Sequence, residues 1–326
     1  MCAPPPAGHP QAAQIAALSA RPRHPSASPF GPDDEIGMLN LATAEAAARV
    51  LAEVDGSRTF DLAVDFFVGM PSFTAGGDPP FEMWMSATPS GSLKEDPLGV
   101  GEAQNRIVSR SGDAFSMFTH TGTHVDALNH IGYDGAVWNG FTEAEHLASR
   151  RWLRAGADRH PPVVARGVLI DVAGLHGVEM LPDSQAIGEA DLRAALGRQG
   201  TELRAGDVVL VRTGRMNVWP DAEAFIADEP GLDLEGARYL ARAGAIMIGA
   251  DNIGLERHPS GDPQSWQPVH TYLLAEAGVP IMEIVNLEEL AADAVHEFAF
   301  VGACLKIRGA TGSPIRPLAL PLRPRA

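Results

Sequence analysis

The stretch from residue 120 to residue 130 reads His-Thr-Gly-Thr-His-Val-Asp-Ala-Leu-Asn-His. It places three imidazoles and one carboxylate at even spacing, on His120, His124, Asp126 and His130. Successive side chains of an extended backbone alternate between two faces, so these four would all point the same way. Imidazole nitrogens and carboxylate oxygens are ordinary ligands of divalent transition metals. The stretch therefore predicts a strand that presents a metal site to a pocket.

A helix is the weaker interpretation of the same stretch. Gly122 and the β-branched residues Thr121, Thr123 and Val125 favour strand or loop over helix. In a helix, histidines four positions apart would share a face, but Asp126 would lie well round the cylinder. The helical His-Glu-x-x-His pattern of metalloproteases does not apply either, because no Glu lies between the histidines.

Hydrolytic zinc and manganese sites need about three protein ligands and an open position for water. His120, His124 and Asp126 can supply the three ligands, and the bound water then loses a proton near neutral pH to become the nucleophile. A nearby group must still pass protons to the leaving atom. His130 lies on the same face if the chain stays extended, so it is our candidate for the catalytic acid/base.

Two further candidate ligands come late in the chain, at His270 and Glu283. Glu283 interrupts an apolar, strand-like run, and a buried carboxylate there must be paired, hydrogen-bonded or bound to a metal. With the first three ligands this makes five candidates. Five suffice for one ion with supporting residues or for two ions that share Asp126.

Composition narrows the class of protein. The chain has 326 residues, of which 45% are hydrophobic, and a formal net charge of −16 from 41 acidic and 25 basic residues. That balance argues against nucleic acid as a partner, since phosphate binding needs a basic face. The two cysteines, Cys2 and Cys304, do not make a disulfide framework and fit a reducing cytoplasm. We see no signal peptide and no apolar run of membrane-span length, so we expect a cytoplasmic protein without a membrane partner.

Periodicity along the chain predicts an α/β fold in one domain. Residues 1–30 are rich in Pro, Ala and Ser, and we expect a flexible N-terminal arm there, followed by a single domain over 31–326. Thr43 is expected to cap a helix that ends near Glu53. Beyond it strand and helix signals alternate, which favours a mixed sheet. Strands are expected at 59–68, 163–172, 207–212, 245–249, 279–285 and 298–307, and helices at 189–198, 221–228 and 234–243.

Three groups of residues complete the predictions. Residues 76–101 lack a clear period, and a loop of that length is usually functional or disordered, so we expect a lid or an oligomer contact. Four aromatic residues are candidates for a substrate-pocket wall: Phe66, Phe67, Trp84 and Trp138. Five histidines in polar or loop contexts are expected at the surface: His146, His160, His176, His258 and His296.

The pattern His-x-Gly-Thr-His-x-Asp-x-x-x-His at 120–130 resembles the signature of the putative cyclase family, which includes bacterial kynurenine formamidase and isatin hydrolase. The resemblance extends over nearly the whole expected domain. The other matching stretches are Gly69-Met-Pro71, Thr213-Gly214, Gly249-Ala-Asp251, Ile281-Met-Glu283 with Asn286-Leu287, and the segment 311–317. The greater length, the segment 76–101 and the pattern Trp138-Asn-Gly140 are similar to a larger subgroup with diverse substrates, so formamidase activity does not follow.

The resemblance implies a fold, a chemistry and a set of roles. The implied fold is a swivelling β/β/α-type single domain with a mixed sheet, assembled as a homodimer or homotetramer. The implied chemistry is hydrolysis of an amide or ester bond in a small cyclic or aryl-linked substrate, with zinc or manganese. The implied roles are the first metal at His120, His124 and Asp126, the acid/base at His130, and a second metal position at His270 and Glu283.

The sequence therefore predicts a metal-dependent hydrolase that cleaves an amide or lactone bond by metal-bound hydroxide. One alternative is a non-haem iron(II) oxygenase, because His124-Val-Asp126 with a distant His270 matches the two-histidine, one-carboxylate triad by residue type. That alternative leaves His120 and His130 unexplained. A second alternative is a non-catalytic metal-binding protein of the same fold. The presence of His130, which metal binding does not require, argues against it.

Overall fold

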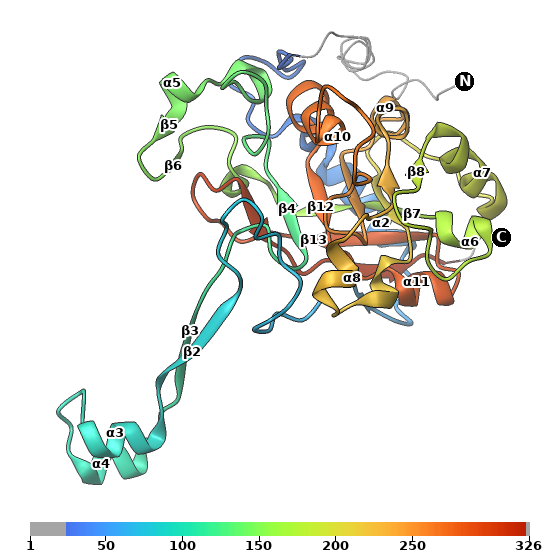
Figure 1. Cartoon of the computed structure of the whole chain (residues 1–326). Coiled ribbons are helices and arrows are strands. Elements are labelled where there is room, and N and C mark those ends of the chain that lie inside the picture. The colour runs from blue at the N-terminus through green and yellow to red at the C-terminus, as the bar shows by residue number, and fades with distance from the viewer. Residues whose placement is uncertain (1–23, 324–326) are drawn as a thin grey trace.

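The computed structural model describes residues 24–323 (Figure 1). Its body is built on a mixed nine-stranded sheet in the order β1-β15-β13-β7-β9-β11-β12-β4-β14. The strands of this sheet are β1 (Phe60–Asp61), β4 (His124–Asp126), β7 (Val163–Asp171), β9 (Val208–Arg212), β11 (Met247–Ala250), β12 (Ile281–Glu283), β13 (Glu297–Gly302), β14 (Gly312–Pro314) and β15 (Leu318–Pro321). The central strands β7, β9, β11 and β12 pair in parallel, whereas the strands outside them pair antiparallel. The expected mixed α/β sheet is thus confirmed.

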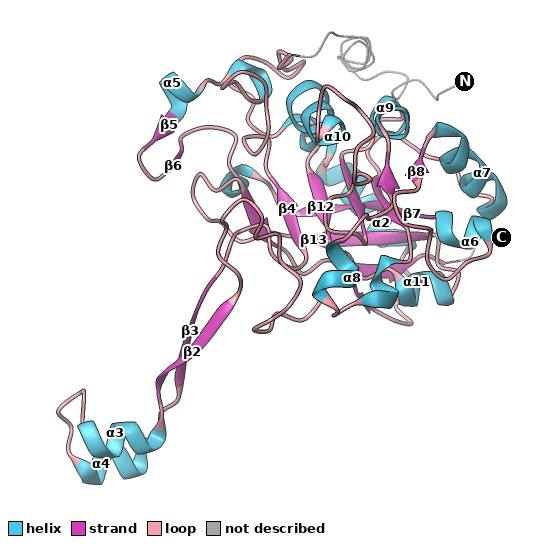
Figure 2. Cartoon of the chain, in the orientation of Figure 1, coloured by secondary structure: helices cyan, strands magenta, loops and turns pink. Residues whose placement is uncertain are grey.

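Short helices lie on both sides of this sheet (Figure 2). Thr43 accepts a hydrogen bond from the backbone N–H of Ala46 and so caps the first of them, as predicted. The α-helices are α2 (Ala44–Glu53), α3 (Pro89–Glu95), α4 (Glu102–Ile107), α5 (Glu143–His146), α6 (Val172–His176), α7 (Glu189–Gln199), α8 (Ala222–Ile226), α9 (Leu234–Arg242), α10 (Pro268–His270) and α11 (Glu288–Ala292). The 3₁₀ segments are η1 (Gly37–Leu41), η2 (Trp138–Gly140), η3 (Ala157–Arg159) and η4 (Arg215–Val218), and a π-helical segment, η5 (Thr271–Ala277), continues α10. No helix among residues 24–323 combines the length and the apolar character that a bilayer span needs.

The central strands form because their sequences are short, apolar and rich in β-branched residues. Every residue of β9, with the sequence Val-Val-Leu-Val-Arg, is buried, as suits a parallel strand covered on both faces. The strands expected at 163–172 and 207–212 are found nearly as predicted, at β7 and β9. The strand expected at 59–68 shrinks to the two residues of β1, and the one expected at 298–307 ends at Gly302.

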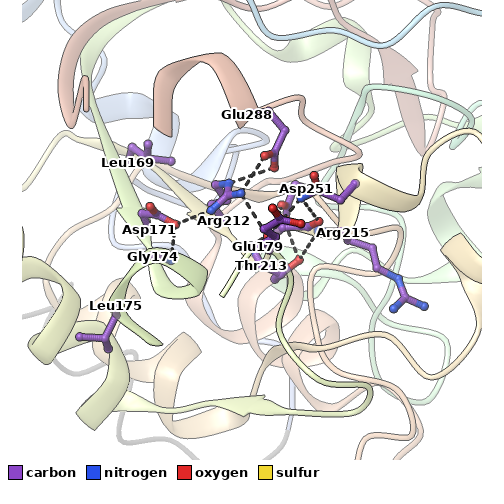
Figure 3. Close-up of polar contacts among 12 residues, drawn as sticks. Leu169, Asp171, Gly174, Leu175, Glu179, Arg212, Thr213, Arg215, Asp251 and Glu288 are labelled. Carbon is purple, nitrogen blue, oxygen red and sulfur yellow. Dashed lines mark hydrogen bonds and ion pairs between the residues drawn. The ribbon is translucent and has the colours of Figure 1, made fainter. Parts of the chain in front are cut away.

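A buried polar network fixes the ends of the central strands (Figure 3). Arg212, the last residue of β9, forms ion pairs with Asp171 at 2.9 Å and with Glu288 at 2.7 Å. Asp251, which follows β11, accepts hydrogen bonds from the backbone N–H and the hydroxyl of Thr213 at 2.8 and 2.7 Å. Burial raises the pKa of Asp251 to about 6. The sequence landmarks around Thr213 and Asp251 therefore join strands β9 and β11 to one another.

Residues 82–116, which we call the projecting hairpin, leave the body altogether (Figure 1). They comprise β2 (Glu82–Ala87), paired antiparallel with β3 (Gly112–Ser116), and the two helices α3 and α4 between them. This segment includes most of the long loop expected at 76–101, so that prediction is wrong about its local structure. Two smaller strand pairs lie elsewhere: β5 (Leu147–Ala148) with β6 (Arg151–Trp152), and β8 (Ala186–Ile187) with β10 (Gly231–Leu232).

The N-terminal arm expected at 1–30 is described only in part. Residues 1–23, with Cys2, lie outside the described residues. Ser26 is buried, and its N–H donates to the carbonyl oxygen of Ala275 while its own carbonyl accepts from Asn139. Residues 24–30 thus pack on the body instead of standing apart from it.

Candidate metal centre

The stretch from His120 to His130 is a strand for three residues only. β4 runs from His124 to Asp126, between β12 and β14, and Glu283 of β12 lies opposite His124. Before the strand the chain turns at Gly122, whose φ is +62°. After the strand it turns again, and the N–H of His130 donates to the carbonyl oxygen of residue 127 at 3.0 Å. The expectation of one extended segment over 120–130 is therefore wrong.

The turns nevertheless return the outer histidines to the same place. Nδ1 of His120 lies 2.5 Å from Oδ1 of Asp126. The ring of His130 stacks on the ring of His120 with centroids 3.9 Å apart. A Cβ on Gly122 would contact the ring of Phe66, so a glycine is what this close turn accommodates. The spacing therefore predicted correctly that these histidines and Asp126 lie together, but they meet through turns and not along one extended strand.

Two groups of potential ligands share Asp126. The first comprises His120, His124 and Asp126, and the second comprises Asp126, His270 and Glu283, with the ligand atoms of each group within 4.8 Å of one another. Glu283 joins the two groups, since its oxygens lie 3.0 Å from Nε2 of His124 and 3.1 Å from Nε2 of His270. Neighbouring strands β4 and β12 and the end of α10 thus bring together the five residues predicted as ligands.

This cluster fits a divalent cation. All five residues are buried. Two of their atoms, Nε2 of His124 and Oδ2 of Asp126, make no well-directed hydrogen bond among residues 24–323, although Nε2 of His124 lies 3.0 Å from a carboxylate oxygen of Glu283. Leaving such atoms unpaired in the interior is costly, and a cation bound between them would remove that cost. Three imidazoles and two carboxylates are donors that zinc and manganese accept.

Hydrogen bonds orient two of the imidazoles. Nδ1 of His270 lies 2.7 Å from Oε1 of Glu256, and Nδ1 of His124 lies 2.8 Å from the carbonyl oxygen of Gly122. An Nδ1–H that donates to an oxygen leaves Nε2 with its lone pair toward the cluster, which is the usual support of metal-bound histidine. Sequence reasoning missed Glu256, because a single carboxylate in a loop has no periodic signal.

The charges of the cluster shift the pKa values of its members in opposite directions. Burial alone would lower the pKa of His124, but the carboxylates of Asp126 and Glu283 raise it to about 10. Burial opposes ionisation of Asp126, yet the adjacent histidines hold its pKa well below its usual range. Burial and the neighbouring His120 lower the pKa of His130 well below that of a free histidine. His130 is therefore a neutral ring at pH 7.

A cavity of about 510 Å³ opens from the cluster. His120, His130, His270 and Glu283 form its floor. Apolar side chains cover much of its remaining wall, namely Phe73, Phe118, Ile131, Ile226, Ile253 and Trp266. Its other polar side chains are Asp78, Glu229, His258 and Gln267.

The weaker sequence predictions about this cavity are corrected. Phe66, Phe67, Trp84 and Trp138 do not line it. Trp138 is wholly buried in the main core and donates to Asp34, whereas Trp84 is half exposed on the projecting hairpin. Apolar character in the sequence could not separate core from pocket wall.

The surface prediction is wrong for His160, and His258 has a place that the sequence did not indicate. His160 is buried, and neither ring nitrogen has a hydrogen-bond partner among the described residues. His258 is partly buried and lines the cavity. Polar neighbours in sequence gave no indication of either position.

A buried nitrogen and oxygen ligand set that opens on a largely apolar cavity places the chain among metal-binding α/β enzymes. Comparison then shows its family: residues 60–257 match the putative cyclase family, and the chain belongs to it. Its likeness to two isatin hydrolases, at 30% and 25% identity, makes it a hydrolase of that family. The iron-oxygenase alternative also leaves unexplained why His120 and Glu283 lie in the same cluster as its three ligands.

Three relatives illustrate the likeness. Isatin hydrolase of Roseibium aggregatum is 30% identical over 207 residues, which are 62% of this chain and 71% of that protein. A crystal structure described as a novel cyclase is 30% identical, with a TM-score of 0.79 over 89% of this chain and 96% of that one. Isatin hydrolase A from Ralstonia solanacearum is 25% identical, with a TM-score of 0.61 over 85% of this chain and 95% of that one.

Proposed function

We propose that this protein hydrolyses an amide or ester (lactone) bond of a small, cyclic or aryl-linked substrate. The observation that carries the proposal is the pair of ligand groups sharing Asp126, which opens on a cavity of about 510 Å³. A cavity of that size suits a molecule of one or two rings. The kinship with isatin hydrolases makes isatin, a cyclic amide, the first compound to test.

We propose zinc or manganese as the metal, with one or two ions. His120, His124 and Asp126 would hold the first, and His270 and Glu283 would complete a second position around Asp126. A divalent cation held in this place would supply a Lewis acid for a substrate carbonyl and would lower the pKa of water toward neutrality.

His130 is the proposed acid/base. Its neutral ring lies in the cavity floor against His120, close to the ligands without belonging to either ligand group. A neutral imidazole can accept a proton as water attacks and then donate it to the leaving nitrogen or oxygen. Glu256 holds His270 in place and so acts on the reaction only through that ring.

The proposal is tested by elemental analysis of the purified protein together with a turnover screen of isatin, small lactones, cyclic imides and aryl formamides. We expect one or two zinc or manganese ions per chain, with turnover of at least one compound. Removal of metal with a chelator should abolish that turnover, and zinc or manganese should restore it. Turnover that survives complete chelation, or dependence on oxygen, would contradict the proposal.

We further propose that the chain works in the cytoplasm as a homodimer or homotetramer, assembled through the projecting hairpin. Hairpin residues Trp84, Leu98, Ile107 and Val108 are each more than half exposed. An isolated two-stranded hairpin is marginally stable in water, and exposed apolar groups of this density usually meet a partner. Since most soluble oligomers are symmetric assemblies of one chain, a second copy is the partner we propose.

A further inference from the structure

A second pair of polar side chains lies in the cavity, apart from the metal ligands. Glu229 follows α8, and His258 follows the loop after β11; Oε1 of Glu229 lies 3.8 Å from Nε2 of His258. Glu229 is wholly buried, and its Oε2 accepts hydrogen bonds from the backbone N–H groups of Ile253 at 2.8 Å and Gly254 at 3.3 Å. Its other oxygen, Oε1, has no hydrogen-bond partner among the described residues.

The backbone holds this pair in place. The N–H of His258 donates to the carbonyl oxygen of Glu229 at 2.9 Å, and the hydroxyl of Ser184 donates to the carbonyl oxygen of His258 at 2.8 Å. A Cβ on Gly254 would lie 2.6 Å from Oε1 of Glu229 and 3.0 Å from Nε2 of His258. The backbone of Gly254 is not in the left-handed region, so its missing side chain matters for the space it leaves beside the pair.

A purely structural role does not account for this arrangement. A buried oxygen without a partner destabilises a protein, and Oε1 accepts no hydrogen bond from any of residues 24–323. Glu229 and His258 both line the cavity into which the proposed metal centre opens. A ligand in that cavity would therefore meet both the cluster and this pair.

We propose that Glu229 and His258 form a subsite that binds a second polar group of the substrate, a carbonyl or hydroxyl oxygen separate from the bond that is cleaved. The inference rests on the proposed function, because it takes the scissile carbonyl to face the metal ligands. The subsite predicts a small, largely apolar substrate that carries a carbonyl or hydroxyl oxygen in addition to the scissile carbonyl.

The chemistry of the pair favours an uncharged oxygen. Burial raises the pKa of Glu229 well above its usual value, which favours the protonated carboxyl and so a group that can donate. Burial lowers the pKa of His258, which leaves this ring neutral as well. A neutral donor beside a neutral imidazole suits a carbonyl or hydroxyl group, and it does not supply the cation that a carboxylate would require.

The test compares isatin with oxindole, which has the same frame without the second ring carbonyl. Both are titrated by calorimetry into the zinc- or manganese-loaded His130→Ala protein, in which turnover is slowed. The same measurement is made with Glu229→Leu, Glu229→Gln, Gly254→Ala and the surface control Glu223→Leu added to that background. Melting temperature and metal content are measured for each variant, so that a folding defect is recognised.

We expect Glu229→Leu and Gly254→Ala to weaken isatin binding by roughly tenfold, the effect of one lost hydrogen bond to a buried group. Oxindole binding should change by less than about twofold, because oxindole lacks the group that the pair binds. Glu229→Gln keeps a donor and an acceptor and should largely restore isatin binding, and Glu223→Leu should change neither ligand. Gly254→Ala keeps the Glu229 carboxyl but puts a Cβ against Oε1 and against Nε2 of His258, so it tests the subsite even if Glu229→Leu folds poorly.

Equal weakening of both ligands, no weakening of either, or failure of isatin to bind the parent protein would overturn the subsite. Failure of the proposed function has a different outcome. Selective isatin binding without chelator-sensitive turnover in the His130-containing protein would refute the hydrolase and leave the subsite standing. Chelator-sensitive turnover with unchanged selectivity in the Glu229 and Gly254 variants would refute the subsite alone.

Discussion

In most proteins apolar side chains are buried and charged side chains are exposed. The metal centre departs from this pattern by burying charged groups, and the projecting hairpin departs from it by exposing apolar ones. The centre buries three histidines and two carboxylates at and beside strands β4 and β12, with atoms that make no well-directed hydrogen bond. The hairpin buries the polar residues Ser92 and Asn105 between α3 and α4, while Trp84 and Ile107 lie exposed. Each arrangement is unfavourable for the isolated chain. We infer that each is completed by something else, a cation in the first case and a second copy in the second.

Asp126→Ala is expected to have the largest effect, because this carboxylate belongs to both ligand groups. The variant should lose bound metal, and kcat/KM should fall by ~10³-fold, the scale of losing a principal electrostatic contribution. Metal content by mass spectrometry and turnover of the best compound in the screen measure the two effects. Asp113→Asn, an exposed carboxylate on the hairpin, is the matched control and should change neither. Normal metal content in Asp126→Ala would show that Asp126 does not bind the metal.

His130→Ala is expected to separate chemistry from metal binding within the centre. His130 belongs to neither ligand group, so metal content should stay at the parent level. Loss of a positioned acid/base should lower kcat by ~10²-fold. Steady-state kinetics and elemental analysis on the same preparation distinguish the roles. Undiminished kcat would exclude His130 as the acid/base, and loss of metal would make it a ligand.

Part of the fold and part of the candidate site could be predicted from the sequence. The runs that became β7 and β9 were predictable, because an apolar, β-branched segment reports its own burial. The clustering of His120, His124, Asp126 and His130 was predictable from their spacing, although His120 and His130 reach the cluster by turns and not along one strand. Those turns depend on contacts that the sequence alone does not show, such as the packing of Gly122 against Phe66.

Residues that serve the site singly from loops were not predictable. Glu256 and Glu229 lie far from the 120–130 stretch in sequence and repeat with no period, yet one holds His270 and the other lines the cavity. The surface prediction for His160 failed for a related reason. Local polarity reports the neighbours of a residue along the chain, whereas burial depends on what packs against it from elsewhere.

His160 offers a way to measure the cost of a buried polar group that no metal relieves. Burial lowers its pKa to about 4, while in the unfolded chain it stays near 6.5. Between those values the unfolded state binds more protons, so this group's contribution to stability is complete above pH 6.5 and is lost as pH falls toward 4. At pH 5 the loss should be ~2 kcal/mol relative to neutral pH.

Urea unfolding at pH 7.5 and pH 5, with chelator present throughout, tests this expectation. His160→Leu should reduce the difference between the two pH values by that amount, since neither ring nitrogen has a partner to lose among the described residues. His176→Gln, at a histidine with a side chain 40% exposed, is the control and should keep the parent difference. The same pH dependence in His160→Leu and parent would show that His160 is not held neutral in the folded protein.

Substitutions on the projecting hairpin are expected to change the oligomeric state without changing the fold. Replacing Trp84 and Ile107 with Ser removes apolar side chains that are 52% and 76% exposed, so the monomer loses little packing. The dissociation constant of the oligomer should rise by about tenfold or more, because exposed aromatic anchors contribute strongly when an interface covers them. Sedimentation velocity over a dilution series measures that constant, with the exposed polar substitution Glu95→Gln as control. A parent protein that stays monomeric at every concentration would mean that another partner, or none, covers the hairpin. The proposal that a second copy of this chain covers it would then be wrong.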